Sequence, residues 1–177
     1  TGNRKATASL PEFWAGQQVA VWPDDGTILT PGFAGATGTN NWSNPGNAVG
    51  SGQGSCSTVN GSAGNPSGFW NTFGLSIPAG NTITGVRVEI KASRGTAAPA
   101  NPTINIGKNE STLGTAKNIT GLANHACGTG QNILSFGGPT DLWGFASITP
   151  AEVNSANFAV RLRAGTNGSS QLRLNWI

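Results

Sequence analysis

Apolar and polar side chains alternate along two widely separated stretches of this chain. Residues 86–92 read Val-Arg-Val-Glu-Ile-Lys-Ala, and residues 158–164 read Phe-Ala-Val-Arg-Leu-Arg-Ala. Each stretch places its charges on one face, which is the period-two pattern of a strand half-buried in an antiparallel sheet. Such a sheet needs a second layer to cover its apolar face. The pattern therefore predicts an all-β fold, an antiparallel β-sandwich of jelly-roll or immunoglobulin-like type.

Shorter patterns add further elements to this sandwich. Alternation over residues 69–77 predicts a strand, and short apolar runs predict others at 104–106, 119–122 and 133–136. Residues 23–66 are rich in Gly, Asn and Ser, which indicates long loops with short strands. Thr149-Pro150-Ala151-Glu152 combines a capping box with Pro at the first helical position, so it predicts one short helical turn near residues 150–154.

The first 22 residues form an N-terminal arm in this interpretation. Its apolar residues are Leu10, Phe13, Trp14, Val19, Val21 and Trp22. So much apolar area acts as an association site when it is exposed. We therefore expect residues 1–22 to pack on their own domain or on a neighbouring subunit, and residues 23–177 to form a single β-sandwich domain.

The low charge of the chain narrows the classes of function. Charged residues make up 10% of the sequence, against about 25% in ordinary soluble domains, and a neutral polar surface of this kind suits an extracellular or particle-bound protein. The net charge of +3 is small, so we expect no nucleic-acid partner. No stretch approaches the roughly 18–20 continuous apolar residues of a membrane-spanning helix, so we expect no membrane span.

The two cysteines, Cys56 and Cys127, lie in Gly- and Ser-rich segments that are typical of loops. A disulfide between them would tie two distant loops together and contribute about 4 kcal/mol in the chain-entropy model. It would also imply an oxidising compartment. We predict this disulfide; two free thiols are the alternative.

Few residues are available for catalysis. His125 lies two residues before Cys127, which suggests a Cys-His nucleophile pair, but a half-cystine beside a loop histidine is the simpler interpretation. Asp24 and Asp25 suggest a calcium site, although two adjacent acids are usually part of a turn. We therefore expect a protein that is not an enzyme and that uses no metal or cofactor.

Three further stretches carry a family resemblance. They are residues 42–48, residues 71–80 continuing into the strand at Val86, and residues 141–144 followed by 149–158. In their order and spacing they resemble a β-sandwich domain that recurs in phage tail and virion proteins and in bacterial surface proteins. The resemblance covers residues 42–177 and implies a non-catalytic structural or adhesive module.

Domains of this family usually carry their last strand several residues further than residues 172–177 do here. A short last strand leaves an open sheet edge, which another segment can complete. The apolar N-terminal arm is the candidate segment, either from the same chain or from a neighbour.

Three sets of residues are candidates for contacts or modification. The candidate subunit interface comprises Phe13, Trp14, Val19, Val21, Trp22, Leu172, Leu174 and Trp176. The candidate basic contact face comprises Arg87, Lys91, Arg161, Arg163 and Arg173, on the condition that their strands are neighbours in one sheet. The candidate glycosylation sequons begin at Asn41, Asn60, Asn109, Asn118 and Asn167.

The leading functional hypothesis is a self-assembling structural or adhesive subunit of an extracellular particle, namely a phage virion protein of the tail, fibre or head decoration. One alternative is a subunit of a cell-surface filament assembled by strand complementation. Another is a carbohydrate-binding module that uses exposed tryptophans. The expected partners are copies of the chain itself, other particle or appendage proteins, and surface glycans.

Overall fold

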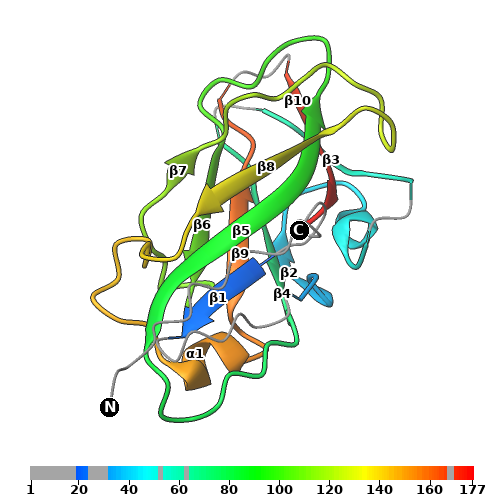
Figure 1. The fold of residues 1–177 in the computed structure, drawn as a ribbon. Helices are drawn as coiled ribbons and strands as arrows, with labels where there is room; N and C mark the ends of the chain where they lie inside the picture. The colour runs from blue at the N-terminus through cyan, green and yellow to red at the C-terminus, as the bar shows by residue number, and fades with distance from the viewer. Residues whose placement is uncertain (1–18, 24–31, 52–53, 62–63, 167–169) are drawn as a thin grey trace.

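The fold is an all-β sandwich, as the sequence predicts. The structure is a computed structural model, and it describes residues 19–23, 32–51, 54–61, 64–166 and 170–177. Two antiparallel sheets stack with their apolar faces together (Figure 1). Among the described residues, the two helical elements are a short 3-10 helix, η1 (Pro45–Ala48), and one α-helical turn, α1 (Pro150–Asn154).

The first sheet, here called the β5 sheet, is built around one long strand. Its strands are β1 (Val19–Pro23), β3 (Ser57–Asn60), β5 (Ile83–Arg94), β8 (Asn132–Gly137) and β10 (Gln171–Trp176). The order is β1-β5-β10-β3, and β8 pairs with β5 as well. The first alternating stretch, residues 86–92, thus lies in β5, the longest strand among the described residues.

The second sheet, here called the β9 sheet, covers the apolar face of the first. Its strands, in spatial order, are β2 (Ala36–Asn40), β4 (Ser67–Asn71), β9 (Ala159–Arg163), β6 (Thr103–Gly107) and β7 (Lys117–Asn118). The second alternating stretch, 158–164, therefore contributes its central strand.

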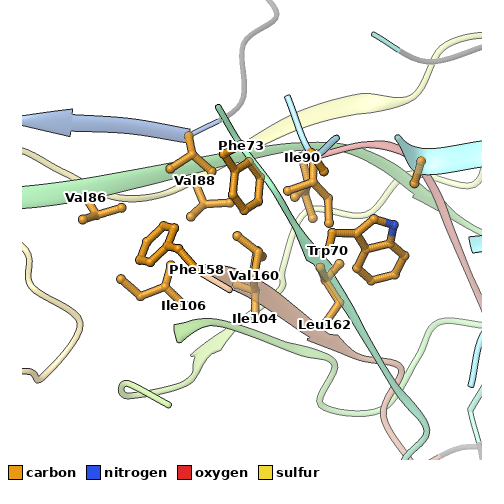
Figure 2. Close-up of a cluster of buried hydrophobic side chains, with 14 of the residues drawn as sticks. Trp70, Phe73, Val86, Val88, Ile90, Ile104, Ile106, Phe158, Val160 and Leu162 are labelled. Atoms are coloured by element: carbon orange, nitrogen blue, oxygen red, sulfur yellow. The ribbon is translucent and has the colours of Figure 1, made fainter. Parts of the chain in front are cut away.

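The core forms where the apolar faces of the two sheets meet. Val86, Val88 and Ile90 of β5 are fully buried. Val160 and Leu162 of β9 are fully buried as well, and Figure 2 shows these side chains in one cluster. Because successive side chains of a strand point to opposite faces, the charged residues of β5 and β9 lie on the two outer faces of the sandwich.

The helical turn α1 confirms the capping prediction. Thr149 Oγ1 accepts a hydrogen bond from the backbone N–H of Glu152, and Glu152 Oε2 accepts one from the backbone N–H of Thr149. These reciprocal bonds satisfy two N–H groups at the helix start that the helix itself leaves unpaired.

Two strand predictions differ from the structure. The alternation over residues 69–77 continues as a strand only to Asn71, because Thr72 and Gly74 take positive φ angles of 58° and 67° that no β-strand contains. The strand expected at 119–122 is wrong; a two-residue strand, β7, comes just before it instead.

The predicted disulfide between Cys56 and Cys127 is confirmed. It joins two segments 71 residues apart in sequence, with a Cα–Cα distance of 5.7 Å. Cys56 directly precedes β3, so the bridge fixes the outer strand of the β5 sheet to the loop that leads into β8.

The helices of the described chain are short. Across the ranges that the structure describes, none is long and apolar enough to cross a bilayer.

Candidate assembly edge

One edge of β5 is shared by two strands that follow each other in a line. β10 pairs with the second half of β5, from Leu172 opposite Arg94 to Trp176 opposite Lys91. β1 pairs with the first half, from Val19 opposite Val88 to Pro23 opposite Ile83. Both strands run antiparallel to β5, so β1 begins where β10 leaves off and completes the same edge (Figure 1).

The side chains of β1 that face the interior belong to the core. Val19 and Val21 are 0% exposed and lie in the main hydrophobic cluster. Full burial of a valine is worth about 1.5–3 kcal/mol, as an upper estimate. The in-line position of β1 is therefore held by apolar burial as well as by strand pairing.

The far side of β1 is bordered by the segment that begins at Gly32. Val19 forms an isolated antiparallel bridge with Gly32. A Cβ atom at Gly32 would collide with the backbone carbonyl of Phe73, so only glycine lets this segment approach closely enough. Ala34 N–H donates to the carbonyl of Ile177 at 3.0 Å, which ties the same segment to the end of β10.

The sequence predicts that the N-terminal arm completes the sheet edge beside the short last strand. In the structure, residues 19–23 of the same chain lie along that edge, in line with β10. Within the arm, Val19 and Val21 are buried in the core, and the backbone of Trp22 pairs with that of Gly85. Phe13 and Trp14 lie outside the described residues, as does the side chain of Trp22.

The other candidate interface residues are not on the surface. Leu172 and Leu174 are 0% exposed and belong to the core. Trp176 is 4% exposed on the outer side of β10, where its ring packs edge-on against Phe33 at 6.0 Å between centroids. These three side chains hold β10 in its own subunit, so the expectation that they form a free contact surface is wrong.

The expected single basic face is also wrong, because its strands belong to different sheets. Arg87, Lys91 and Arg173 lie in the β5 sheet, whereas Arg161 and Arg163 lie in the β9 sheet. The alternating pattern predicts which side of a strand is polar, but it does not determine the sheet to which the strand belongs.

Two of the basic residues of the β5 sheet, Arg87 and Arg173, have partners. Arg87 forms an ion pair with Glu89 at 3.6 Å. Arg173 donates hydrogen bonds to the side chain of Gln171 and to the backbone carbonyl of His125. This part of the expected face is occupied with contacts inside the subunit.

A polar cavity on the outside of the β9 sheet has no counterpart in the sequence analysis. It has a volume of about 260 Å³, and its walls are Asn71, Asn109, Glu110, Ser111 and Asn157. Asn109, Glu110 and Ser111 form one of the candidate sequons, but nothing in the sequence indicates that they meet Asn71 and Asn157.

The four tryptophans whose side chains the structure describes are buried. Trp42 and Trp70 pack edge-on inside the sandwich, with 5.1 Å between ring centroids, and Trp143 Nε1 donates to the carbonyl of Val86 at 2.8 Å. Together with Trp176, they leave no exposed indole ring for stacking on a sugar among the side chains that the structure describes.

Three kinds of candidate residue remain: the Cys-His pair, the glycosylation sequons and the acidic residues suggested for calcium. Cys127 is bonded to Cys56, so its sulfur is not a thiol that His125 could activate. The sequon residues Asn41, Asn60, Asn109 and Asn118 are exposed, and Asn167 lies outside the described residues, as do Asp24 and Asp25. No group of three or more His, Cys, Asp or Glu side chains gathers as a metal site among the residues described.

The chain matches no model of a known protein family, and a search of curated proteins finds no match. The resemblance to phage virion and bacterial surface domains therefore stays a prediction from the quoted residues.

Proposed function

We propose that the protein is a non-enzymatic structural subunit of an extracellular assembly, in which β1 of one copy completes the β5 edge of the next. One observation carries this proposal: β1 continues the line of β10 along β5 with two fully buried valines. Completing a sheet edge with an apolar strand from another chain is a known mode of subunit association.

The pairing of β1 with β5 is well suited to exchange between identical chains. A second copy supplies a β1 with the same backbone groups and the same two valines, so every contact within one chain is available between two. Residues 24–31 connect β1 to the body of the sandwich, and eight extended residues span at most about 26–29 Å. The exchange requires the accepting edge of the adjoining subunit to lie within that reach.

Such an exchange allows an open chain of subunits as well as a reciprocal dimer. The donated strand and the accepting edge are different surfaces, so each copy gives one strand and receives another. A head-to-tail contact of this kind closes into a ring only if the rotation allows it, and otherwise produces a filament.

The setting we propose is outside the cell. The disulfide between Cys56 and Cys127 persists in oxidising compartments. The sequence resemblance supports a phage virion protein, and the strand arrangement supports the alternative of a cell-surface filament. Electron microscopy of the native material distinguishes these two settings, and a free monomer with no assembly would count against both.

Cysteine cross-linking tests the exchange itself. Ala20 lies opposite Arg87 in the β1–β5 register, and directly opposed residues are close enough for a disulfide. Each variant chain carries one free thiol besides the native disulfide, so we expect a mixture of the single variants Ala20→Cys and Arg87→Cys to form disulfide-linked dimers under mild oxidation.

An out-of-register mixture provides the control. Lys91 lies four residues further along β5, about 13 Å from the partner of Ala20, so Ala20→Cys with Lys91→Cys should not cross-link. The double variant Ala20→Cys/Arg87→Cys should link within one chain when monomeric. Failure of the first mixture to link, while the double variant does, would show that β1 stays in its own subunit and would refute the proposal.

A further inference from the structure

The outer face of the β9 sheet carries two adjacent arginines that the assembly proposal does not use. Arg161 and Arg163 alternate with the buried residues of β9, so both point away from the core. Arg161 lies opposite Phe69 of β4 and Asn105 of β6. Arg163 lies one row further along the same face.

Arg161 is held in place by a buried amide. Its Nε donates to Asn105 Oδ1 at 3.0 Å, and Asn105, which is 2% exposed, donates from Nδ2 to the carbonyl of Gly114. Burial, together with the like charge of Arg163, lowers the pKa of Arg161. The guanidinium is thus fixed in orientation beside a second positive charge.

Neither arginine is neutralised within the described part of the chain. The three ion pairs found there join other residues, so no carboxylate lies within 4.0 Å of Arg161 or Arg163. The Nε of Arg163 is buried and has no hydrogen-bond partner. Two guanidiniums with free donors on one face form a site that is complementary to a carboxylate.

The polar cavity lies next to these arginines on the same face. Asn71 follows Phe69 by two residues on β4 and pairs with Ala159, which precedes Arg161 by two residues on β9. A step of two residues along a strand is about 7 Å. The cavity and Arg161 are therefore one row apart.

The loop after β6 closes the cavity from outside. Glu110 Oε1 accepts a hydrogen bond from the backbone N–H of Thr39 at 2.9 Å, which places this loop across the sheet as far as β2. Asn109 Oδ1 accepts from the backbone N–H groups of Ser111 and Thr112, which fixes the turn. These three hydrogen bonds hold the cavity wall in place.

We propose that this face of the β9 sheet binds an acidic saccharide, with sugar hydroxyls in the cavity and a carboxylate on Arg161 and Arg163. Three amides, a hydroxyl and a carboxylate line the cavity, and they offer both donors and acceptors, as a hydroxyl-rich ring requires. The volume is below the roughly 300–1,000 Å³ of clefts for drug-sized ligands, so one sugar ring is the unit that fits. The site lies on the sheet opposite the β1–β5 edge and does not depend on the assembly proposal.

The test is a titration with a trimer of galacturonic acid, followed by amide NMR shifts and calorimetry. We expect binding at about millimolar Kd or tighter, with shifts at the amides of Asn71 and Arg161. The variant Arg163→Gln should weaken binding about 10- to 100-fold, because it removes charge-assisted hydrogen bonds. Since the side chain of Arg163 makes no hydrogen bond within the described chain, this variant should fold normally.

Two controls separate the proposal from simple charge attraction. Lys91→Gln removes one positive charge from the opposite sheet and should leave the affinity unchanged. The methyl ester of the trimer, which lacks the free carboxylates, should bind as weakly to the wild-type protein as the acid binds to Arg163→Gln. Absence of shifts on the β9 sheet, equal binding of the ester, or equal loss of affinity in Lys91→Gln would each overturn the proposal.

Discussion

Shortening the two buried valines of β1 should loosen one half of the β5 edge and leave the other half intact. The double variant Val19→Ala/Val21→Ala removes two methyl groups from each of two side chains that are 0% exposed. At about 0.8 kcal/mol for each buried group, the transfer free energy lost is about 3 kcal/mol. Any cavity that remains adds to this figure.

This free energy is lost from the packing of β1 on the core, so its loss favours local detachment of β1 from β5. If β1 can detach while the rest of the sandwich stays folded, 3 kcal/mol raises the population of the detached state about 150-fold. Hydrogen exchange at amides that β1 protects should accelerate by that factor. Thermal unfolding of the remaining sandwich should change much less.

β5 itself provides the internal control for this assay. The N–H and C=O groups of Val86 bond away from β1, to Asp141 and Gly138, so by alternation the amides of Gly85 and Arg87 face β1. The amides of Lys91 and Ser93 face β10 in the same way. We expect faster exchange at the first pair and unchanged exchange at the second; equal acceleration at both would show that β1 is not a separable element and would refute the reasoning.

The other predictions concern the stability of the fold. Replacing Cys56 and Cys127 by Ser should lower the unfolding free energy by about 4 kcal/mol, seen in calorimetry as a fall in Tm of about 8–16 °C. Thr149→Ala removes the helix cap and should cost about 1 kcal/mol in chemical denaturation. Burial raises the pKa of Asp141, but the hydrogen bond and charge of Lys117 help lower it below 3.8 overall; the stabilisation is therefore present above about pH 4 and is lost as the pH falls through the folded-state pKa. Lys117→Gln should accordingly lower Tm by about 1–3 °C at pH 7, and this difference should disappear once the pH has fallen below the folded-state pKa of Asp141.

The sequence is sufficient to predict the layers of this fold. The alternation at Val86 and at Val160 depends only on local geometry and burial, so it identifies the strands and their apolar faces. The capping box at Thr149 is equally local. The backbone conformation of Thr72, at φ 58°, is not determined locally, because nothing in its side chain favours a left-handed backbone. The strand predicted over residues 69–77 therefore ends before that residue.

The candidate sites could be predicted only where a local pattern marks them. The sequence shows that Arg161 and Arg163 share the polar face of one strand, but their separation from Arg87 follows from long-range strand order. The cavity at Asn71 and Glu110 depends on a loop that leaves β6 and reaches β2 across the two strands between them, and no period or motif in the sequence predicts this. The position of β1 could be predicted in part, since the apolar arm and the short last strand can both be inferred from the sequence.

The in-line arrangement of β10 and β1 also constrains how assembly can begin. A strand tethered to its own edge by residues 24–31 has an effective concentration of the order of 1 mM there, and exchange replaces its contacts by identical ones. Dilute subunits should therefore remain self-completed, which keeps the β5 edge from acting as an open template for aggregation. Exchange becomes favourable only where neighbouring copies are already concentrated above that level, as they are at the end of a growing filament or on the surface of a particle. The strand that protects the free subunit is thus the same one that would join subunits in the assembly.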